Sequence, residues 1–309
     1  MTDLLIHGMH GLGDNLHQRS VLRQLIPHHR IWLETPWPCV YHDLVGDRLK
    51  LISKGSRLRT QAKNATREAA RFSRLPPPLS ARRRPLSVSY APDLVRSHGS
   101  VLGAMSAHCG VQMGDFSLPI PGEWQAKASR WLAQWSPSKP LMIYRPLVER
   151  SEWGGCPSRN PDHAAYAKLA ESIRDRYFVI SIADLQPGAE WIVGKPLNAD
   201  VEMHAGELDF ETIAALTARA ALVFSSPGFA VILAQSVGAP VCCVFGGYEN
   251  ASSFSGGAHL APYLGIQPIN PCDCFSHRHP CDKRIDMLSA MIDLQNFVNE
   301  TADLRPLAA

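Results

Sequence analysis

A short turn near the start of the chain combines backbone and side chains that could bind and activate a substrate. Gly11 and Gly13 lie in the run Gly-Leu-Gly-Asp, between an expected strand at residues 4–9 and an expected helix at residues 15–26. Glycines let the backbone approach a ligand closely, and the start of a helix presents unpaired N–H groups to it. Asp14 could either cap this helix or accept a proton from a substrate hydroxyl. The local sequence leaves both interpretations open.

A second turn of the same kind occurs in the later half of the chain. Ser225, Ser226 and Gly228 separate an expected strand at residues 221–225 from an expected helix at residues 229–237. Serine hydroxyls and the N–H groups of a helix start can hold a diphosphate, and a helix cap without a ligand is the alternative. Two strand-turn-helix sites, one in each half, predict binding sites that face each other across a cleft.

Three cysteines and two histidines lie together near the end of the chain. Cys272, Cys274 and Cys281, with His277 and His279 between them, could hold a structural zinc or iron ion. Their spacing differs from that of a zinc ribbon, so a metal-free surface loop is the alternative. No part in catalysis is expected for this metal. The eight cysteines of the chain are interpreted as free thiols or metal ligands rather than disulfides.

Positive charge is concentrated between Arg48 and Arg84. This segment contains twelve basic residues and one acid, Glu68, a net charge of +11 in a chain whose formal net charge is +3. One expected helical face would carry five of the basic residues: Arg59, Lys63, Arg67, Arg71 and Arg74. Such a field attracts a polyanion, either a phosphorylated glycan or a nucleic acid, and a merely solvated face is the alternative.

The elements that position these residues alternate between apolar runs and helical patterns, as in doubly wound α/β proteins. At 309 residues, with 45% hydrophobic and 19% charged residues, the chain has the length and composition of two globular domains. A polar, proline-containing stretch at residues 136–140 places the boundary between domains 1–138 and 139–309. The last expected helix, residues 285–301, could pack back on the first domain. No apolar run long enough to span a bilayer and no signal peptide are evident, so a cytoplasmic location is expected.

Several segments together carry a family resemblance that covers most of the chain. They are Gly11–Asp14, Ser97–Ile120, Tyr144–Pro161, His204–Asp209 and Leu222–Gly247. In these segments the sequence resembles glycosyltransferase family nine, the ADP-heptose:lipopolysaccharide heptosyltransferases and their relatives. The resemblance implies a GT-B fold, in which two Rossmann-like, doubly wound domains face each other across a cleft. The first domain would bind the acceptor and the second the nucleotide sugar.

The resemblance also implies an activity and a set of roles. The enzyme would be an inverting hexosyl- or heptosyltransferase in which Asp14 deprotonates an acceptor hydroxyl, and the leaving diphosphate would be stabilised without a metal. The expected donor-binding residues are Arg145, Arg159, Glu207, Ser225, Ser226 and Gly228. The expected acceptor-binding residues are Gly11, Gly13, Arg59, Lys63, Arg67 and Arg71. A phosphorylated, lipopolysaccharide core-like glycan at the inner membrane surface is the favoured acceptor, with protein or modified DNA as alternatives.

One departure from the family affects the donor, and two other functions remain open. Heptosyltransferases carry Asp-Ser/Thr-Gly with a histidine three residues on, whereas this chain has Ser226-Pro227-Gly228 and Val231, so the donor need not be ADP-heptose.

A nicotinamide-linked oxidoreductase would use Glu34 on a ribose, although the glycines lack the full dinucleotide pattern. A non-catalytic polyanion-binding protein is the other alternative. His10 and His17 are expected at the surface.

Overall fold

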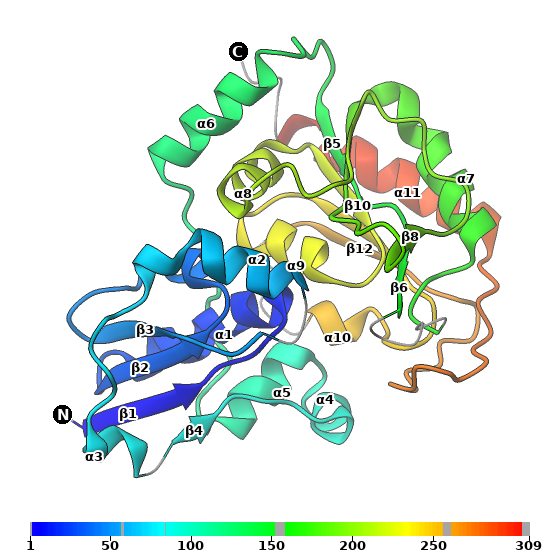
Figure 1. Ribbon diagram of the computed structural model, residues 1–309. Helices are drawn as coiled ribbons and strands as arrows, with labels where there is room; N and C mark the ends of the chain where they lie inside the picture. The colour runs from blue at the N-terminus through cyan, green and yellow to red at the C-terminus, as the bar shows by residue number, and fades with distance from the viewer. Residues whose placement is uncertain (1, 57–58, 84, 152–157, 256–260, 305–309) are drawn as a thin grey trace. The chain divides into compact units, whose positions relative to one another are not determined.

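The computed structural model describes residues 2–56, 59–83, 85–151, 158–255 and 261–304, and Figure 1 shows its elements. The chain divides into two compact units, Met1–Pro119 with Ser252–Ala258, and Ile120–Ala251 with His259–Ala309. The division therefore precedes α6 (Gly122–Leu132), earlier than the expected boundary at residue 138. The reason is that α6 packs on α8 (Phe210–Arg219), where the rings of Trp124 and Phe210 meet edge to face with centroids 6.1 Å apart.

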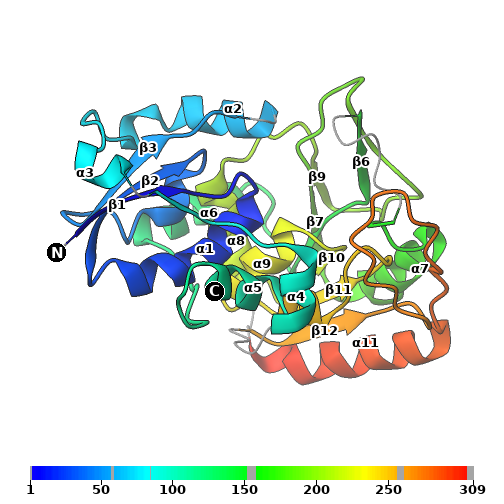
Figure 2. The same cartoon turned by 90° about the horizontal axis from the view of Figure 1, so that it is seen from below.

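The first unit is built on a four-stranded parallel sheet with the order β3-β2-β1-β4. Its strands are β1 (Thr2–His7), β2 (His29–Thr35), β3 (Leu49–Ser53) and β4 (Leu86–Ser87). Alternate residues of β2, Ile31 and Leu33, are fully buried, as expected for a strand with one face on a core. Helices α1 (Leu12–Leu25) and α2 (Arg59–Arg67) lie on opposite sides of this sheet (Figure 2).

Two short helices follow β4 and meet at a glycine. Helix α4 (Pro92–His98) ends at Gly99, whose φ of 75° is a left-handed conformation that glycine adopts readily. Helix α5 (Val101–His108) then begins after Ser100, whose hydroxyl oxygen accepts a hydrogen bond of 3.0 Å from the Gly103 N–H. The remaining short elements of this unit are η1 (Pro38–Tyr41), η2 (Ala69–Arg71), α3 (Leu79–Arg82) and α10 (Ser252–Ser255).

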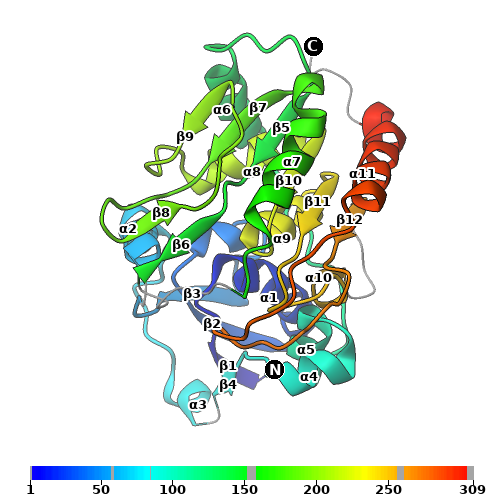
Figure 3. The ribbon, with the colours of Figure 1, turned by 90° about the vertical axis from the view of Figure 1, so that its right-hand side faces the viewer.

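The second unit contains a six-stranded parallel sheet with the order β12-β11-β10-β5-β7-β9. Its strands are β5 (Leu141–Tyr144), β7 (Phe178–Ile182), β9 (Val201–Met203), β10 (Leu222–Ser225), β11 (Val241–Val244) and β12 (Tyr263–Ile266). The central strands β5, β10 and β11 are buried along their whole length, which explains their continuous apolar sequences. Helices α7 (His163–Ile173) and α11 (Met287–Thr301) cover one face, and α8 and α9 (Phe229–Ser236) cover the other (Figures 1 and 3).

In both sheets the order of the strands reverses once. In the second unit the chain runs outward from β5 through β7 to β9 and then returns to β10, beside β5, before continuing to β11 and β12. In the first unit the corresponding reversal lies between β1 and β4. Helices on the two sides of such a reversal diverge, which leaves a crevice at the carboxyl ends of the strands where ligands bind. The predicted class, two Rossmann-like doubly wound units, is confirmed.

The last long helix packs within the second unit. Some short elements of this unit were not predicted from the sequence. The buried residues Leu294, Phe297 and Val298 of α11 belong to the same core as α7, whereas the sequence analysis allowed packing on the first domain. An antiparallel ribbon of β6 (Val148–Arg150) and β8 (Glu190–Ile192) was not predicted. The short turns η4 (Arg174–Arg176) and η5 (Ala302–Leu304) complete this unit. No helix among the described residues is long and apolar enough to cross a membrane.

Candidate active site

Asp14 lies in the first turn of α1, directly after β1 and at the strand reversal of the first unit. The residue at the N-cap of α1 is Gly11, so Asp14 does not cap the helix, which was one of its two possible roles. A Cβ atom on Gly11 would meet the Asp14 carboxylate, so a larger residue here would move that side chain. Tyr90, which follows β4, donates a hydrogen bond of 3.1 Å to Asp14 Oδ1. Asp14 is half-buried, and it lies at the N-terminal end of α1, where the helix dipole is positive.

A buried polar network under the turn holds this geometry in place. The Asn15 amide donates to the carbonyl oxygens of Met9 at 2.9 Å and Gly11 at 2.7 Å. Its amide oxygen accepts hydrogen bonds from the hydroxyls of Thr35 at 2.7 Å and Tyr41 at 2.8 Å. Sequence reasoning missed this network, although an asparagine directly after Asp14 and among buried helix residues was a signal for it. The backbone that carries Asp14 is therefore pre-organised.

The histidines near this turn, and Glu34, contact other residues of the first unit. His17 is 3% exposed and packs edge to face on Phe116 at 5.0 Å, so its expected surface position is wrong. Burial lowers the pKa of His17 to about 3. Glu34 Oε2 lies 2.6 Å from His7 Nδ1. The carboxylate that an oxidoreductase would place on a ribose is therefore paired with a histidine. The His10 carbonyl accepts a hydrogen bond of 2.8 Å from the indole N–H of Trp37.

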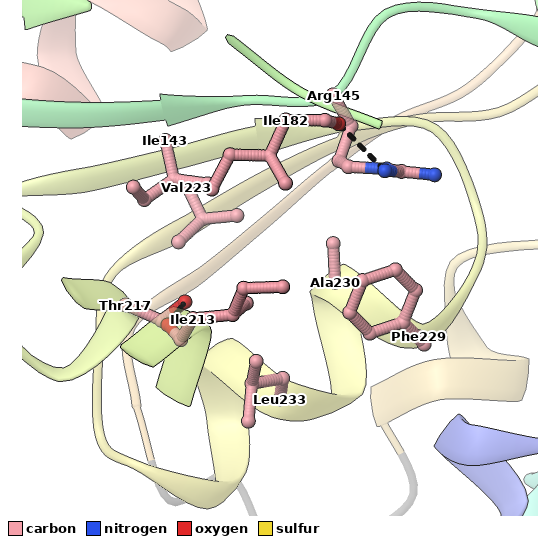
Figure 4. A pocket seen from close by; sticks show the side chains of 9 residues that line it. All are labelled: Ile143, Arg145, Ile182, Ile213, Thr217, Val223, Phe229, Ala230 and Leu233. Atoms are coloured by element: carbon pink, nitrogen blue, oxygen red, sulfur yellow. Dashed lines mark hydrogen bonds between the residues drawn. The ribbon is translucent and has the colours of Figure 1, made fainter. Parts of the chain in front are cut away.

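The second unit contains a pocket at its own strand reversal, between β5 and β10 (Figure 4). Its walls are mainly apolar and come from the sheet and from helices α8 and α9. The lining residues are Ile143, Arg145, Ile182, Ile213, Thr217, Val223, Phe229, Ala230 and Leu233. Arg145 is the only charged residue among them, so it dominates the electrostatics of the pocket.

The Arg145 guanidinium is held by contacts on several sides. Its Nη1 donates a hydrogen bond of 2.6 Å to the Ile182 carbonyl, and its central carbon lies 5.2 Å from the centroid of the Phe229 ring. The Tyr166 hydroxyl donates to the Arg145 carbonyl at 2.6 Å, which fixes the backbone. Burial lowers the pKa of Arg145 to about 10, so the group remains protonated at neutral pH.

The predicted turn at residues 225–228 directly precedes Phe229, which lines this pocket. Ser225 ends β10, and Gly228 occupies the cap position before α9, so the first residue of that helix is Phe229, which contacts Arg145. The Ser225 hydroxyl donates to the Ser226 carbonyl at 2.7 Å. A glycine cap has no side chain with which to bind the N–H groups at the start of α9. A guanidinium and a helix start therefore meet at one place, which suits a diphosphate.

Two other predicted donor residues lie elsewhere along the carboxyl edge of the second sheet. Arg159 pairs with Glu249, whose carboxylate oxygen lies 2.9 Å from Arg159 Nη2, after the end of β11. Glu207 follows β9, is exposed, and accepts a hydrogen bond of 2.9 Å from the Ala205 N–H. Because all six strands are parallel, these residues share the edge that carries Arg145. The structure thus places Arg145 against Phe229, the first residue after the serine turn, and gives Arg159 a separate acidic partner.

The basic residues do not form one continuous helical face. Helix α2 ends at Arg67, Arg71 lies in η2, and Arg74 lies beyond both, so the expected five-residue face is interrupted. Arg67 and Arg71 are exposed, Lys63 is half-buried, and Arg71 is 3.5 Å from Glu68. Arg57, Arg84 and the side chain of Arg59 lie outside the described residues. The helix stops because Glu68 has φ −108° and ψ 21°, a non-helical conformation.

The cysteine loop has the geometry of a metal site. Sulfur and nitrogen atoms of Cys272, Cys274, His279 and Cys281 lie within 4.8 Å of one another. The Sγ atoms of Cys274 and Cys281 are 3.6 Å apart, and His279 Nδ1 is 3.3 Å from Cys281 Sγ. A tetrahedral ion with Zn–S bonds of about 2.3 Å would separate neighbouring ligand atoms by about 3.5–3.8 Å. The donor set therefore fits zinc or iron, with His279 as a fourth ligand that the sequence analysis had not selected over His277.

Comparisons with known proteins define the fold. No model of a known protein family matches the chain, and no curated protein matches it. Among solved structures, glycosyl transferase family 9 from Veillonella parvula DSM 2008 superposes with a TM-score of 0.60 at 13% identity, covering 97% of each chain. ADP-heptose lps heptosyltransferase II of E. coli gives a TM-score of 0.57 at 14% identity, covering 98% of this chain and 100% of that one.

A third structure is similar and contains a metal. The iron-containing dodecameric glycosyltransferase TibC from enterotoxigenic E. coli H10407 gives a TM-score of 0.59 at 13% identity, covering 97% of this chain and 76% of that chain. These likenesses establish a GT-B fold of two Rossmann-like units. More particularly, the fold is the one found in glycosyltransferase family 9, as the sequence resemblance predicted.

Proposed function

We propose that this protein is a glycosyltransferase that moves a hexosyl or heptosyl group from a nucleotide-diphosphate sugar to a hydroxyl of an anionic acceptor. The observation that carries the proposal is the contact of Arg145 with Phe229, the first residue of α9, at the strand reversal of the second unit. A cation near the start of a helix suits a diphosphate. The fold is consistent with this donor class, since TibC has been solved in complex with ADP-D-β-D-heptose.

The proposed reaction inverts the anomeric centre in a single displacement. The acceptor oxygen forms a bond to the anomeric carbon while the bond from that carbon to the diphosphate breaks. Asp14 receives the hydroxyl proton, and the nucleoside diphosphate leaves with the bonding electrons. The N–H groups at the start of α9, Arg145 and Arg159 would stabilise the developing charge on the diphosphate. In this scheme Ser225, Ser226 and Gly228 shape the diphosphate site, and Glu207 contacts the donor from the end of β9.

In this proposal the donor need not be ADP-heptose. Ser226-Pro227-Gly228 and Val231 stand where the family's heptosyltransferases carry an acid and an imidazole. Val231 is fully buried in α9, so this position offers no polar group to a sugar. A hexose, or a heptose bound through other groups, is the substrate class that fits the altered turn.

The proposed acceptor is a phosphorylated glycan carried on a lipid surface. Gly11 and Gly13 would let it approach Asp14, and Arg59, Lys63, Arg67 and Arg71 would bind its phosphates. One structural feature favours this acceptor over nucleic acid: Leu75 is 72% exposed and Leu79 is 76% exposed. Exposed basic side chains flank them in the sequence, at positions 74, 82 and 83. Apolar side chains among cations favour the interface of an anionic membrane.

The cysteine cluster is proposed as a structural metal site. Cys272, Cys274, His279 and Cys281 would hold zinc or iron, and the ion would stabilise the loop without taking part in group transfer. TibC is an iron-containing glycosyltransferase of the same fold, and the soft donor set of the present chain accepts either metal.

A ligand screen tests the proposal directly. Nucleotides, nucleotide sugars and nicotinamide cofactors would be compared by thermal shift, because a ligand at 100 times its dissociation constant stabilises the native state by about 2.7 kcal/mol. Stabilisation by a nucleotide sugar, followed by transfer to a lipid-linked phosphorylated glycan, is the expected result. Stabilisation by NAD(P)H alone would support an oxidoreductase instead, and no response to any nucleotide would contradict a transferase.

A further inference from the structure

The cysteine loop packs directly on the turn that follows β11. The Cys274 N–H donates to the Gly247 carbonyl at 3.3 Å, and the Cys274 thiol donates to the same oxygen at 3.4 Å. A Cβ atom on Gly247 would lie 2.7 Å from Cys281 Sγ, closer than real contacts allow. Gly247 therefore has to be a glycine for the loop to close over it, and two of the proposed metal ligands rest on this one residue.

The same turn holds Arg159. Glu249 is 6% exposed and its carboxylate pairs with Arg159 Nη2 at 2.9 Å. The Arg159 guanidinium carbon lies 5.9 Å from the centroid of the Tyr248 ring. A Cβ atom on Gly246 would lie 2.5–2.7 Å from the carbonyl oxygens of residues 158–160, so the turn also packs against the backbone of Arg159. Residues 246–249 thus fix both the backbone and the side chain of this arginine.

Residues between the proposed ligands make a second connection to this arginine. The Tyr248 ring packs on Phe275 at 5.5 Å and on His277 at 5.2 Å. The Ser158 hydroxyl, next to Arg159 in the sequence, donates to the Ser276 carbonyl at 2.6 Å. A metal bound through Cys274 and His279 would close residues 275–277 into a short, rigid loop, because both of its ends would be ligated.

We infer that a metal ion at the cysteine cluster positions Arg159 for the donor diphosphate, with Gly247, Tyr248 and Glu249 as the connection. The inference rests on the proposed function, in that Arg159 contacts the diphosphate. A bound metal would order the turn and Arg159 before the nucleotide binds. Nucleotide binding would then not have to supply the free energy of ordering them. Nucleotide affinity should then depend on an ion that touches neither substrate.

The experiment compares metal content with nucleotide affinity in the full chain. We expect purified protein to contain one zinc or iron ion per chain by elemental analysis. Removing the ion with a chelator, or substituting Cys274→Ser, should weaken the binding of ADP, UDP or GDP by about tenfold or more in calorimetry, the loss typical of one charge-assisted contact. Adding zinc or iron should restore the stripped protein. Cys109→Ser, in the first unit, is the matched control and should change neither quantity.

Two further variants separate positioning from general loss of structure. Gly247→Ala retains all four ligands but obstructs Cys281, so metal content and nucleotide affinity should fall together. Arg159→Ala should retain the metal and lose affinity, and stripping its metal should cause no further loss. Circular dichroism confirms the fold of each variant. Metal-independent nucleotide binding, or a purified protein that binds no metal, would overturn this inference alone, whereas unmodified protein that binds no nucleotide would overturn the proposed function as well.

Discussion

The hydroxyl of Tyr90 lies 3.1 Å from the carboxylate of Asp14 and donates a hydrogen bond to it. This contact joins the two sides of the strand reversal in the first unit, because Asp14 lies in the first turn of the helix after β1 and Tyr90 follows β4. A base at this position needs a fixed orientation toward its substrate, and the Tyr90 phenol supplies it by donating to one carboxylate oxygen.

Replacing this carboxylate by an amide tests its role as a base. Asp14→Asn keeps the shape of the side chain and cannot accept the proton, so we expect turnover to fall about a hundredfold or more with little change in nucleotide affinity. Steady-state kinetics and calorimetry measure the two quantities. Tyr90→Phe should have a smaller effect, because it removes only the orienting hydrogen bond. Turnover that stays near the original value in Asp14→Asn would return Asp14 to a purely structural position in the first turn of α1.

The charge of Arg145 should determine donor binding. Arg145→Met retains most of the packing in the pocket and removes the cation, so we expect the dissociation constant of the nucleoside diphosphate to rise about tenfold or more. Arg176→Met, on the surface of the same unit, is the matched control, since Arg176 bonds to the side chain of Asn299 at 2.8 Å. Equal affinities of both variants would place the diphosphate away from the strand reversal.

The sequence predicted the order of elements well because the buried parallel strands form continuous apolar runs between helical patterns. Strand β10 and helix α9 lie within one residue of their expected bounds, and Asp14 and Arg145 both lie at strand reversals. The partners of these residues were not predictable. Tyr90 is 76 positions from Asp14, and Glu249 is 90 positions from Arg159. Neither pair has a local spacing rule, because pairing across a sheet depends on strand order rather than on sequence distance.

The position of His17 shows a second limit. A histidine on an amphipathic helix is typical of the surface, but this helix is buried from Asn15 to Leu22 and the imidazole fills space beside Phe116. The buried residues of α1 include polar as well as apolar side chains, so the sequence pattern does not show that His17 is buried. Only the tertiary structure places it in the core. Its position has a measurable consequence for the pH dependence of stability.

His17 should make the first unit less stable in mild acid. Burial lowers its pKa from 6.5 to about 3 in the folded state, so below pH 6.5 the unfolded chain binds a proton that the folded chain does not. Stability is therefore fully present above pH 6.5 and declines as the pH falls toward 3. Between pH 7 and pH 5 this group alone should cost about 2 kcal/mol.

Denaturant unfolding at several pH values measures this decline. His17→Leu should flatten it, and His28→Gln, at an exposed position, should leave it unchanged. Burial also lowers the pKa of His42 and His204, so some pH dependence should remain in the His17 variant. Identical pH profiles for His17→Leu and the original protein would show that another group is responsible.

The basic residues of the first unit should bind the acceptor and not the donor. Reversing Arg67 and Arg71 to Glu should raise the Michaelis constant of a phosphorylated acceptor and leave that of the donor unchanged. Affinity for the acceptor should fall with salt, because the cations and the phosphates are exposed and screened. A slope of about −0.9 per phosphate on duplex DNA, summed over several contacts, would support a nucleic acid acceptor instead. No salt dependence at all would mean that these charges are only solvated.

Leu75 and Leu79 allow the source of the acceptor to be tested separately. Each exposed leucine that enters a membrane interface gains about 1.5–3 kcal/mol when fully buried, and neighbouring arginines gain about 1 kcal/mol each near anionic lipid. The protein should therefore sediment with vesicles of phosphatidylglycerol and phosphatidylcholine in equal parts, and much less with phosphatidylcholine alone. Leu75→Ser with Leu79→Ser should abolish most of this binding while nucleotide affinity stays constant. Val45→Ser, which changes another exposed apolar residue of the same unit, is the control. Equal sedimentation of the double variant and the control would leave the arginines as the only membrane contact, and no sedimentation of the original protein would favour a water-soluble acceptor.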